Sequence, residues 1–324
     1  MKKVILFVSK GENSSATRYR ALQYFPKFIE AGWKPKHATI SGGIISIINT
    51  LFAASQADVV VLLRKTFPSP IFWLLRKLSK KLIFDFDDAI FCNTDGSYSK
   101  TRMRRFAATV SNCDYIFAGN KYLANEAKKY NANVSIIPTS LDIGKYNLTF
   151  QKSNVAFELV WIGSQSTKKY IAEIIPSLEI AAQTIPNLQL KIIADFELSS
   201  TILNIINERW SEKTEALSLR KADVGLAPMS ENNWTKGKCA LKVLQYMAAG
   251  LPVISSPSGV NAYVVENGIS GYLATDNQWG TLLSQMYKER EQLASMGEHG
   301  KRRVQSEFSI SVVFQKMLHI INLQ

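Results

Sequence analysis

The sequence predicts two α/β domains, each built on a parallel β-sheet with helices wound on both faces. Its 324 residues exceed one ordinary domain, so two domains are expected. Short apolar runs alternate with longer amphipathic stretches, and such strand–helix alternation is typical of doubly wound parallel sheets. The alternation pauses at a polar stretch, Asn147–Asn154, and then resumes. We therefore place the domain boundary near residue 150.

The first domain, residues 1–150, contains six apolar runs that predict strands, and the amphipathic stretches between them predict helices. The expected strands are Val4–Val8, Lys36–Ile40, Val59–Leu63, Leu82–Asp85, Tyr115–Ala118 and Ser135–Ile137. The expected helices are Arg18–Ala31, Ile44–Ala54, Pro70–Leu78, Thr101–Ser111 and Lys121–Tyr130.

The second domain, residues 151–308, repeats this pattern, and residues 309–324 predict a separate amphipathic helix. Its expected strands are Phe157–Ile162, Leu188–Ala194, Val224–Ala227, Pro252–Ser255 and Gly271–Ala274. Its expected helices are Lys168–Thr184, Thr214–Lys221, Cys239–Ala249 and Gln278–Leu293. Ligands of parallel sheets bind at the carboxyl ends of the strands, so the residues that follow each strand are the candidates for chemistry.

The composition narrows the class of protein. The N-terminal apolar run, Val4–Val8, is short and no small-residue cleavage site follows it, so we expect a buried strand rather than a signal peptide. No run approaches the ~20 apolar residues of a membrane span. The cysteines lack CxxC spacing, which argues against a disulfide framework or a zinc site and fits a reducing cytoplasm. The histidines form no set, and no nucleophile elbow or Walker A motif supports a hydrolase or a kinase.

The net charge of +13 lies almost entirely in the first domain. The first 150 residues hold 22 Lys and Arg against 10 Asp and Glu, whereas the remainder holds 17 against 16. Such an excess of positive charge favours binding of a phosphate-bearing partner or an anionic membrane. The alternative is that the charge only keeps the protein soluble. The apolar run Ile71–Leu75 precedes Arg76, Lys77, Lys80 and Lys81, which suits a helix lying on an anionic membrane. A core-packed helix with a solvated rim is the alternative.

Three lysines, Lys236, Lys238 and Lys242, surround the start of the helix expected at 239–249. Free N–H groups and the positive end of the macrodipole make a helix N-terminus a phosphate site. Cations there oppose the macrodipole, so a sequence that places them at that end usually has an anion to bind. Lys242 and Gln245 share a helix face, which Lys238 is expected to join. A solvated basic turn is the alternative.

The loop after the first strand of the second domain begins with a glycine and continues with hydroxyl residues. Such a strand-to-helix turn suits phosphate oxygens, with plain helix capping as the alternative. The candidates are Gly163, Ser164, Ser166, Thr167 and Lys168.

Two pairs of charged residues follow strands of the first domain. Asp87 and Asp88 can orient an acceptor hydroxyl, accept a proton or hold a metal, or they can cap a helix. Arg18 and Arg20 open the helix after the first strand and are good forks for phosphate or carboxylate. Because they are two residues apart they cannot share a helix face, and we expect one of them to lie at the surface.

The run Leu244–Ile254, LQYMAAGLPVI, and its continuation through Ser258–Gly259 to Leu273 resemble the donor-site signature of the retaining glycosyltransferases of family 4, or group 1. The resemblance implies the GT-B fold, in which two Rossmann-like domains face each other across a cleft. It implies an acceptor domain followed by a nucleotide-sugar donor domain, and a C-terminal helix that packs back toward the first domain. It further implies that Gly259 belongs to the donor site.

The family holds its nucleotide base near the position of Trp210, so the resemblance implies that this indole stacks on the base. A buried structural tryptophan is the alternative. GT-B enzymes are generally metal-independent, so we expect no metal and no cofactor besides the nucleoside diphosphate sugar that serves as donor.

The sequence departs from the family at three donor-site positions. Family members typically have two glutamates, one near the sugar and one near the ribose, where this chain has Gly237 and Gln245. The amide of Gln245 can still bond ribose hydroxyls, whereas Gly237 offers only backbone. The resemblance is closer to a subgroup with a Gly-Lys-Cys segment in place of the first glutamate. Ser164 stands where the family usually has an arginine for the diphosphate, which leaves Lys168 or Lys169 as the cation.

The resemblance implies transfer of a sugar, with retention, to a glycan or lipid-linked acceptor in cell-surface polysaccharide or glycoconjugate synthesis. Lys168, Lys238 and Lys242 would neutralise the departing diphosphate. We expect a cytoplasmic protein whose basic first domain contacts the inner face of the membrane. The alternatives are a nucleotide-sugar epimerase of the same fold and a catalytically silent nucleotide- or glycan-binding protein. The hypothesis of a nucleic-acid-binding protein is supported by charge alone, because the basic regions lack interleaved aromatic residues or a recognised nucleic-acid-binding module.

Overall fold

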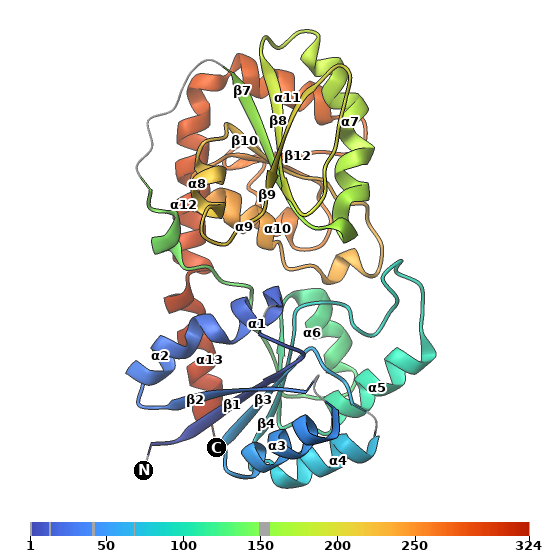
Figure 1. The fold of residues 1–324 in the computed structure, drawn as a ribbon, viewed down its shortest axis with the longest axis vertical. Coiled ribbons are helices and arrows are strands. Elements are labelled where there is room, and N and C mark those ends of the chain that lie inside the picture. Colours follow the sequence, from blue (N-terminus) through green and yellow to red (C-terminus); the bar gives the residue numbers. More distant parts are fainter. Residues whose placement is uncertain (1, 13, 41–42, 68, 149–155, 324) are drawn as a thin grey trace. The chain divides into compact units, whose positions relative to one another are not determined.

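The computed structural model describes residues 2–12, 14–40, 43–67, 69–148 and 156–323. By its internal contacts the chain forms two compact units (Figure 1). Unit 1 comprises Met1–Ser140, Asn232–Cys239 and Ile310–Gln324, and unit 2 comprises Leu141–Glu231 and Ala240–Ser309.

Unit 1 contains a six-stranded parallel sheet in the order β2-β1-β3-β4-β5-β6. The strands are β1 (Val4–Ser9), β2 (Lys34–Thr39), β3 (Val59–Leu63), β4 (Leu82–Phe86), β5 (Tyr115–Ala118) and β6 (Val134–Ile136). The helices are α1 (Ser15–Arg20), α2 (Phe25–Glu30), α3 (Gly43–Ser55), α4 (Ser69–Leu78), α5 (Lys100–Ser111), α6 (Lys121–Lys128) and α13 (Ile310–Asn322). The expected helix Arg18–Ala31 is thus divided: α1 ends at Arg20, a 3-10 turn follows, and α2 begins at Phe25.

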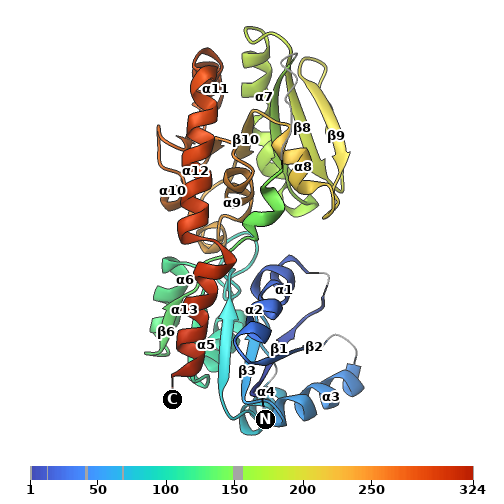
Figure 2. The ribbon, with the colours of Figure 1, turned by 90° about the vertical axis from the view of Figure 1, so that its left-hand side faces the viewer.

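The C-terminal helix α13 belongs to unit 1, as the resemblance implied. Its buried face contacts the side of the sheet covered by α2 (Figure 2). Phe314 meets the ring of Phe28 edge-on at 4.9 Å between centroids, and Phe28 in turn packs on Phe7 of β1. Such aromatic contacts bury large apolar surfaces, so the end of the chain is part of the first hydrophobic core.

Unit 2 contains a second six-stranded parallel sheet, in the order β12-β11-β10-β7-β8-β9. The strands are β7 (Phe157–Ile162), β8 (Leu188–Ala194), β9 (Asn204–Arg209), β10 (Val224–Ala227), β11 (Val253–Ser255) and β12 (Gly271–Leu273). The helices are α7 (Lys168–Ala182), α8 (Glu215–Arg220), α9 (Leu241–Ala248), α10 (Asn261–Val264), α11 (Trp279–Lys288) and α12 (Leu293–Glu307). Two parallel sheets with helices confirm the predicted α/β class.

Two glycines let α12 approach α9 closely. A Cβ at Gly297 would lie 2.0 Å from the carbonyl oxygen of Gly250, just after α9, and a Cβ at Gly300 would lie 3.1 Å from Cγ of Met247. Larger residues would therefore push the two helices apart.

The units differ in detail from the domain limits expected at residues 150 and 308. The boundary near residue 150 falls among residues 149–155, which lie outside the described residues. Leu141–Leu148 associates with unit 2, and the eight-residue segment Asn232–Cys239 associates with unit 1 although it lies between β10 and α9. Each unit therefore draws on more than one stretch of the chain.

Candidate functional site

Lys242, in the first turn of α9, lies against the loop that follows β7. Its Nζ lies 3.1 Å from Oγ1 of Thr167 and 4.1 Å from the centre of the Trp161 ring, which it faces as a cation on an aromatic ring. Gly163 makes this approach feasible, because a Cβ there would lie 2.8 Å from Nζ of Lys242 and 2.1 Å from the Trp161 ring. The structure thus brings together Lys242, Gly163 and Thr167, which the sequence proposed separately as candidates for a phosphate site.

The hydroxyl residues of the same loop have two kinds of contact. Ser164 and Thr167 cap the turn: the Ser164 N–H donates to Thr167 Oγ1 at 3.3 Å, and the Thr167 N–H donates to the Ser164 carbonyl at 2.9 Å. The Ser164 and Ser166 hydroxyls are exposed and lie 3.0 Å apart. Capping therefore accounts for part of this pattern, and exposed hydroxyls remain beside the Lys242 ammonium group.

Lys168 does not join Lys242 in the structure. Its Nζ donates to the carbonyl of Glu197 at 3.2 Å and lies 4.8 Å from the centre of the Phe196 ring. The loop after β8 therefore holds the Lys168 ammonium group.

Tyr246 fixes α9 to the sheet of unit 2. Its hydroxyl donates to the carbonyl of Leu226 in β10 at 3.1 Å and accepts from the N–H of Ile162 in β7 at 2.9 Å. The side chain is fully buried, and burial raises the pKa of this phenol well above its ordinary value. These bonds bridge two strand ends and set the position from which Lys242 reaches its loop.

Glu215, in the first turn of α8, connects Trp210 and Gln245. The indole N–H of Trp210 donates to its Oε2 at 2.7 Å, and the Gln245 amide donates to its Oε1 at 2.6 Å. The Tyr146 hydroxyl donates to Oε1 at 3.0 Å. Glu215 and Gln245 are buried, so three donors satisfy a carboxylate that is shielded from water.

The helix of the lysine motif begins at Leu241, two residues later than expected. Lys238 has extended backbone with φ −71° and ψ 144°, so it lies outside the helix and does not share a face with Lys242. Its Nζ lies 2.8 Å from Oδ1 of Asp88 and 4.5 Å from the centre of the Trp234 ring. The expectation that Lys238 joins the Lys242 face is therefore corrected, because Asp88 holds this ammonium group within unit 1.

The backbone of the 236–239 segment is fastened to unit 1 as well. The Asn120 amide, just after β5, donates to the carbonyls of Lys236 and Lys238 at 3.1 Å each. Gly237 is buried, and a Cβ there would lie 2.6 Å from the backbone nitrogen of Ala89. The Gly237 position thus requires the absence of a side chain, so a glutamate would not fit in this conformation.

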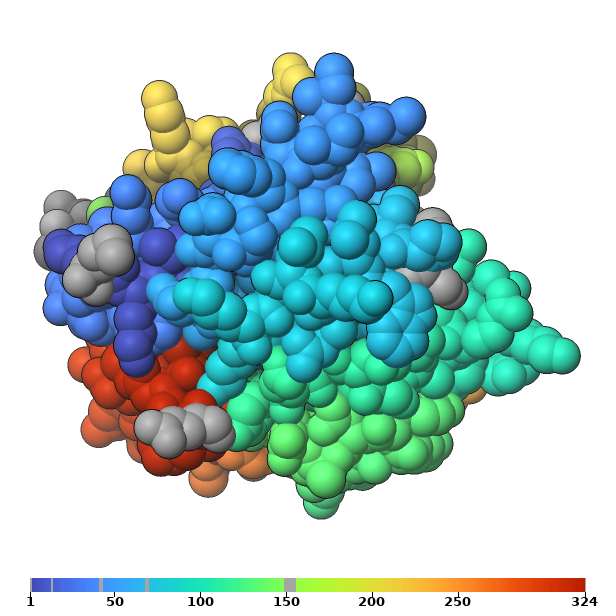
Figure 3. Space-filling model, turned by 90° about the horizontal axis from the view of Figure 1, so that it is seen from below, coloured from blue at the N-terminus to red at the C-terminus, as the bar shows by residue number. Residues whose placement is uncertain are grey.

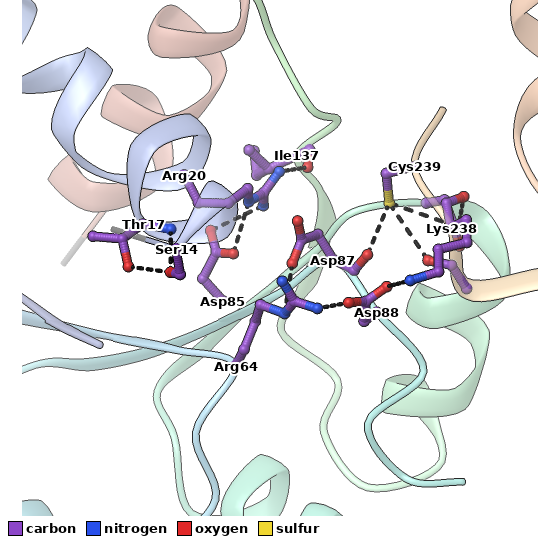
Figure 4. A network of polar contacts seen from close by, with 12 residues as sticks. Ser14, Thr17, Arg20, Arg64, Asp85, Asp87, Asp88, Ile137, Lys238 and Cys239 are labelled. Carbon is purple, nitrogen blue, oxygen red and sulfur yellow. Dashed lines mark hydrogen bonds and ion pairs between the residues drawn. The ribbon is translucent and has the colours of Figure 1, made fainter. Parts of the chain in front are cut away.

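Asp87 and Asp88 belong to a chain of charges at the carboxyl end of β4 (Figure 4). Arg64 binds Oδ2 of Asp88 with its Nη2, and its Nε lies 3.1 Å from Oδ1 of Asp87. Asp88 is therefore paired on both oxygens, with Arg64 and Lys238, whereas Asp87 pairs with Arg64 among the described residues. Arg64 has φ 52°, a left-handed conformation that a non-glycine residue adopts at a cost.

Arg20 is a buried structural residue rather than a surface fork for phosphate. Its guanidinium binds both oxygens of Asp85 at 2.8 and 2.9 Å, and its Nη1 donates to the carbonyl of Ile137 at 2.7 Å (Figure 4). Burial raises the pKa of Asp85 to about 6, although Arg20 opposes the shift. Arg18 is half-buried and lies over the Tyr19 ring, 5.9 Å from its centre, so the two arginines are separated as expected.

Gly259 has φ 62°, in the left-handed region that favours glycine, in the turn between β11 and α10. Around it the Ser258 hydroxyl donates to the carbonyl of Met229 at 3.1 Å, and the Asn261 amide donates to the Ser255 hydroxyl at 2.9 Å. This turn is therefore fixed at the ends of β10 and β11, in the same unit as Lys242.

Glu215, Arg64 and Asn120 belong to these networks and were not among the sequence candidates. Arg64 directly follows β3 and Asn120 lies two residues after β5, so the strand-end rule applied to every strand would have found them. Glu215 lies in the first turn of a helix, where an acidic residue is expected for the macrodipole alone. No group of three or more His, Cys, Asp or Glu residues suited to a metal ion occurs in the described part of the chain.

The comparisons with known proteins agree with this architecture. The family model described as "Glycosyl transferases group 1" matches residues 151–288. A 78-residue stretch is 31% identical to spore coat protein SA of Bacillus subtilis, and the match covers 23% of this chain and 21% of that protein.

Solved structures resemble the whole chain. HepE of Anabaena, crystallised in complex with UDP and glucose, superposes with a TM-score of 0.70 at 13% identity over 98% of both chains. Sucrose-phosphate synthase of Thermosynechococcus elongatus superposes with a TM-score of 0.71 at 12% identity over 98% of both chains. A glycosyltransferase of Rickettsia africae gives 0.71 at 13% identity, over 99% of this chain and 98% of that one. The expected GT-B fold is confirmed, and the family match together with these neighbours supports a glycosyltransferase.

Proposed function

We propose that this chain transfers a sugar, with retention and without a metal, from a nucleoside diphosphate sugar to a glycan or lipid-linked acceptor. This transfer reaction would take place in the cytoplasm and would serve the synthesis of a cell-surface polysaccharide or glycoconjugate. The observation that supports the proposal best is the placement of the Lys242 ammonium group against the Gly163–Thr167 loop, within the region that matches the group 1 glycosyltransferases. A cation, exposed hydroxyls and strand-end backbone are the groups that bind a diphosphate.

Lys242 is the proposed catalytic cation. Cleavage of the bond between sugar and diphosphate places negative charge on the departing phosphate. A fixed cation stabilises that charge most in the transition state, because the group needs no reorganisation as the charge develops. The Trp161 ring and the Thr167 hydroxyl hold the ammonium group in position before the donor binds. HepE, a structural neighbour, was crystallised with UDP and glucose, which accords with a UDP-sugar donor here.

Gln245 and Trp210 are proposed to contact the nucleoside. The carboxylate of Glu215 engages the amide N–H of one and the indole N–H of the other. We propose that the Trp210 ring stacks on the nucleotide base. Glu215 would then act as a positioning residue that orients both side chains.

Lys238 is proposed to act with Asp88 rather than as a phosphate ligand, since each neutralises the other. Asp87, which pairs with Arg64 and has no lysine partner among the described residues, is the stronger candidate to accept a hydrogen bond from the acceptor hydroxyl. The subgroup with a Gly-Lys-Cys segment is the one we propose, because Gly237 packs where a side chain does not fit.

Contact with an anionic membrane is proposed through the face of unit 1 that displays α3 and α4 (Figure 3). Most of the basic residues in the last turn of α4 and just after it form contacts within the protein. Arg76 pairs with Asp114 at 2.8 Å, Lys80 pairs with Asp58 at 2.9 Å, and Lys81 donates to the carbonyl of Ile321 at 3.1 Å. Trp73 and Leu74 of α4 are exposed, and α5 exposes four basic side chains: Lys100, Arg102, Arg104 and Arg105. No helix among the described residues is long and apolar enough to cross a membrane.

The test is a donor screen followed by product analysis. Nucleotide sugars are screened by thermal shift, and the best stabiliser is incubated with the protein and a membrane extract. Release of nucleoside diphosphate together with a glycosylated product supports the proposal. Donor consumption that yields a new nucleotide sugar without any acceptor would instead identify an epimerase. Donor binding without either product would identify a silent binding protein, the alternative that Gly237 and Gln245 suggest.

A further inference from the structure

The helix α3 exposes an unusual amount of apolar surface. It has no charged residue in its thirteen positions. Its exposed fractions are 77% for Ile44, 73% for Ile45, 58% for Ile48 and 69% for Phe52. Single exposed apolar residues are common, but four large ones within three turns of one helix form a patch of the kind that marks a binding surface.

A cavity of about 560 Å³ lies beside this patch, between α3 and the edge strand β2. This volume is within the range of small-molecule sites, roughly 300–1,000 Å³. The lining residues are His37, Ala38 and Thr39 of β2 and Ile45, Ser46, Asn49, Thr50 and Ala53 of α3. In Figure 3 the surface of α3, in bright blue, adjoins that of α4, in cyan.

Thr50 contributes a polar group that the protein leaves unsatisfied. The residue is 1% exposed and lines the cavity, and its Oγ1 has no hydrogen-bond partner among the described residues. Buried hydroxyls are nearly always hydrogen-bonded, so an exception inside a cavity indicates a ligand atom that completes it.

The remaining lining groups are neutral. None of the lining residues is Lys, Arg, Asp or Glu, so the cavity offers a phosphate no cation. The two His37 ring nitrogens are engaged by the Ser9 hydroxyl at 2.8 Å and by Glu12 at 3.3 Å, and the Ser46 hydroxyl donates to the carbonyl of Thr39. The Asn49 amide and the Thr50 hydroxyl are left to meet a ligand, and such neutral donors and acceptors match sugar hydroxyls.

We propose that this cavity binds the sugar of a glycolipid, with the hydrocarbon chain lying along Ile44, Ile48 and Phe52. One end of the site is polar and neutral and the other is apolar and exposed, which fits an amphipathic molecule better than a free sugar or a free lipid. The glycolipid would be the acceptor, and this assignment of the acceptor rests on the proposed function. The binding itself does not depend on it.

The test uses the full chain and short-chain octyl glycosides below their micelle concentration: the glucoside, the galactoside and the N-acetylglucosaminide. Binding is measured by calorimetry, with the free sugars as probes of the head alone. Thr50→Val removes the hydroxyl at nearly constant volume. We expect it to weaken the best octyl glycoside about five- to tenfold, the effect of one hydrogen bond, while the melting temperature stays level or rises because an unsatisfied group is gone.

Ile48→Ser should weaken the octyl glycoside and leave the affinity for the free sugar unchanged. The matched control is Ile29→Ser, at a residue of α2 that is 55% exposed, which should change neither affinity. The proposal is overturned if no octyl glycoside binds, if Thr50→Val binds as tightly as wild type, or if the three octyl glycosides bind equally tightly whatever their sugar.

These outcomes are separable from the proposed function, because no donor is present. Binding that depends on Thr50, without any sugar transfer, would refute the transferase proposal and keep the site. Transfer to octyl glycosides that is unaffected by Thr50→Val and Ile48→Ser would refute the site and keep the transferase.

Discussion

Exchanging the carboxylate and the amide between Glu215 and Gln245 tests whether these two side chains are energetically coupled. In Gln245→Glu the 2.6 Å hydrogen bond from the amide of residue 245 to Glu215 is lost, and two carboxylates face each other at buried positions. An uncompensated buried charge costs about 3–5 kcal/mol of the free energy of unfolding. Glu215→Gln places an amide NH₂ against at least one donor, and because hydrogen bonds to a charged group contribute about 1.5–3 kcal/mol, we expect a loss of about 2–3 kcal/mol.

The double variant, Glu215→Gln with Gln245→Glu, restores a donor–acceptor pair at the same contact. The amide oxygen of residue 215 can still accept from Trp210, and the Tyr146 hydroxyl can rotate to accept instead of donate. We therefore expect the double variant to be more stable than Gln245→Glu by about 2 kcal/mol or more, a coupling typical of directly bonded side chains.

The assay is urea denaturation followed by tryptophan fluorescence. Gln305→Glu, at an exposed position of α12, is the matched control and should lie within about 0.5 kcal/mol of wild type. The reasoning is refuted if Gln245→Glu is as stable as wild type, or if the double variant is no more stable than Gln245→Glu alone.

Three further perturbations test the fold around the candidate sites. Asp85→Asn leaves the buried guanidinium of Arg20 without its counter-charge, so urea titration should show a loss of about 3–5 kcal/mol; an unchanged midpoint would contradict the structural role of this pair. Gly297→Ala places a methyl group 2.0 Å from the carbonyl oxygen of Gly250, and we expect about 1–3 kcal/mol of destabilisation and a lower melting temperature, whereas a stabilised variant would mean that α12 packs differently. The backbone N–H of Val4 and then Lys80 lower the pKa of Asp58, so this carboxylate stabilises the fold above its unfolded pKa of 3.8 and loses that contribution as the pH falls through its folded pKa. The difference in the free energy of unfolding between wild type and Asp58→Asn should accordingly be present at pH 7 and disappear in acid. A difference that grows as the pH falls would contradict the lowered pKa of Asp58.

The strands could be predicted from sequence wherever both faces of the sheet are covered. Val59–Leu63, Tyr115–Ala118 and Phe157–Ile162 were predicted at their observed limits, since strands buried on both faces read as continuous apolar runs. β9 was not predicted, because this edge strand, Asn204–Arg209, is mostly exposed and has little apolar content.

Helix α12 was missed for a different reason. Its buried face includes Gly297 and Gly300, which have low helix propensity, and most of its other residues are polar. Their close contact with the end of α9 decides the structure there, and a contact between distant segments leaves no local pattern in the sequence.

In the candidate site, too, features with a local sequence pattern could be predicted and contacts between distant segments could not. Lys242 was named as a candidate because it lies at the start of a recognisable helix, and the Gly163–Thr167 loop because it follows a recognisable strand. The pairing of Lys238 with Asp88 was not, because the two residues are 150 positions apart and the segment that contains Lys238 associates with unit 1. The sequence named Lys238 and Asp88 as separate candidates and could not say that they neutralise one another.

The turnover number of Lys242→Ala, measured with the donor and acceptor found by the screen, tests the central claim most directly. We predict that kcat falls by about 10²–10³-fold, the effect of removing one preorganised charge-stabilising group, while the melting temperature remains near that of wild type. Lys301→Ala, which removes a lysine of α12 in the same unit, should leave kcat unchanged. A Lys242→Ala protein that turns over at the wild-type rate would show that this ammonium group does not stabilise the departing diphosphate.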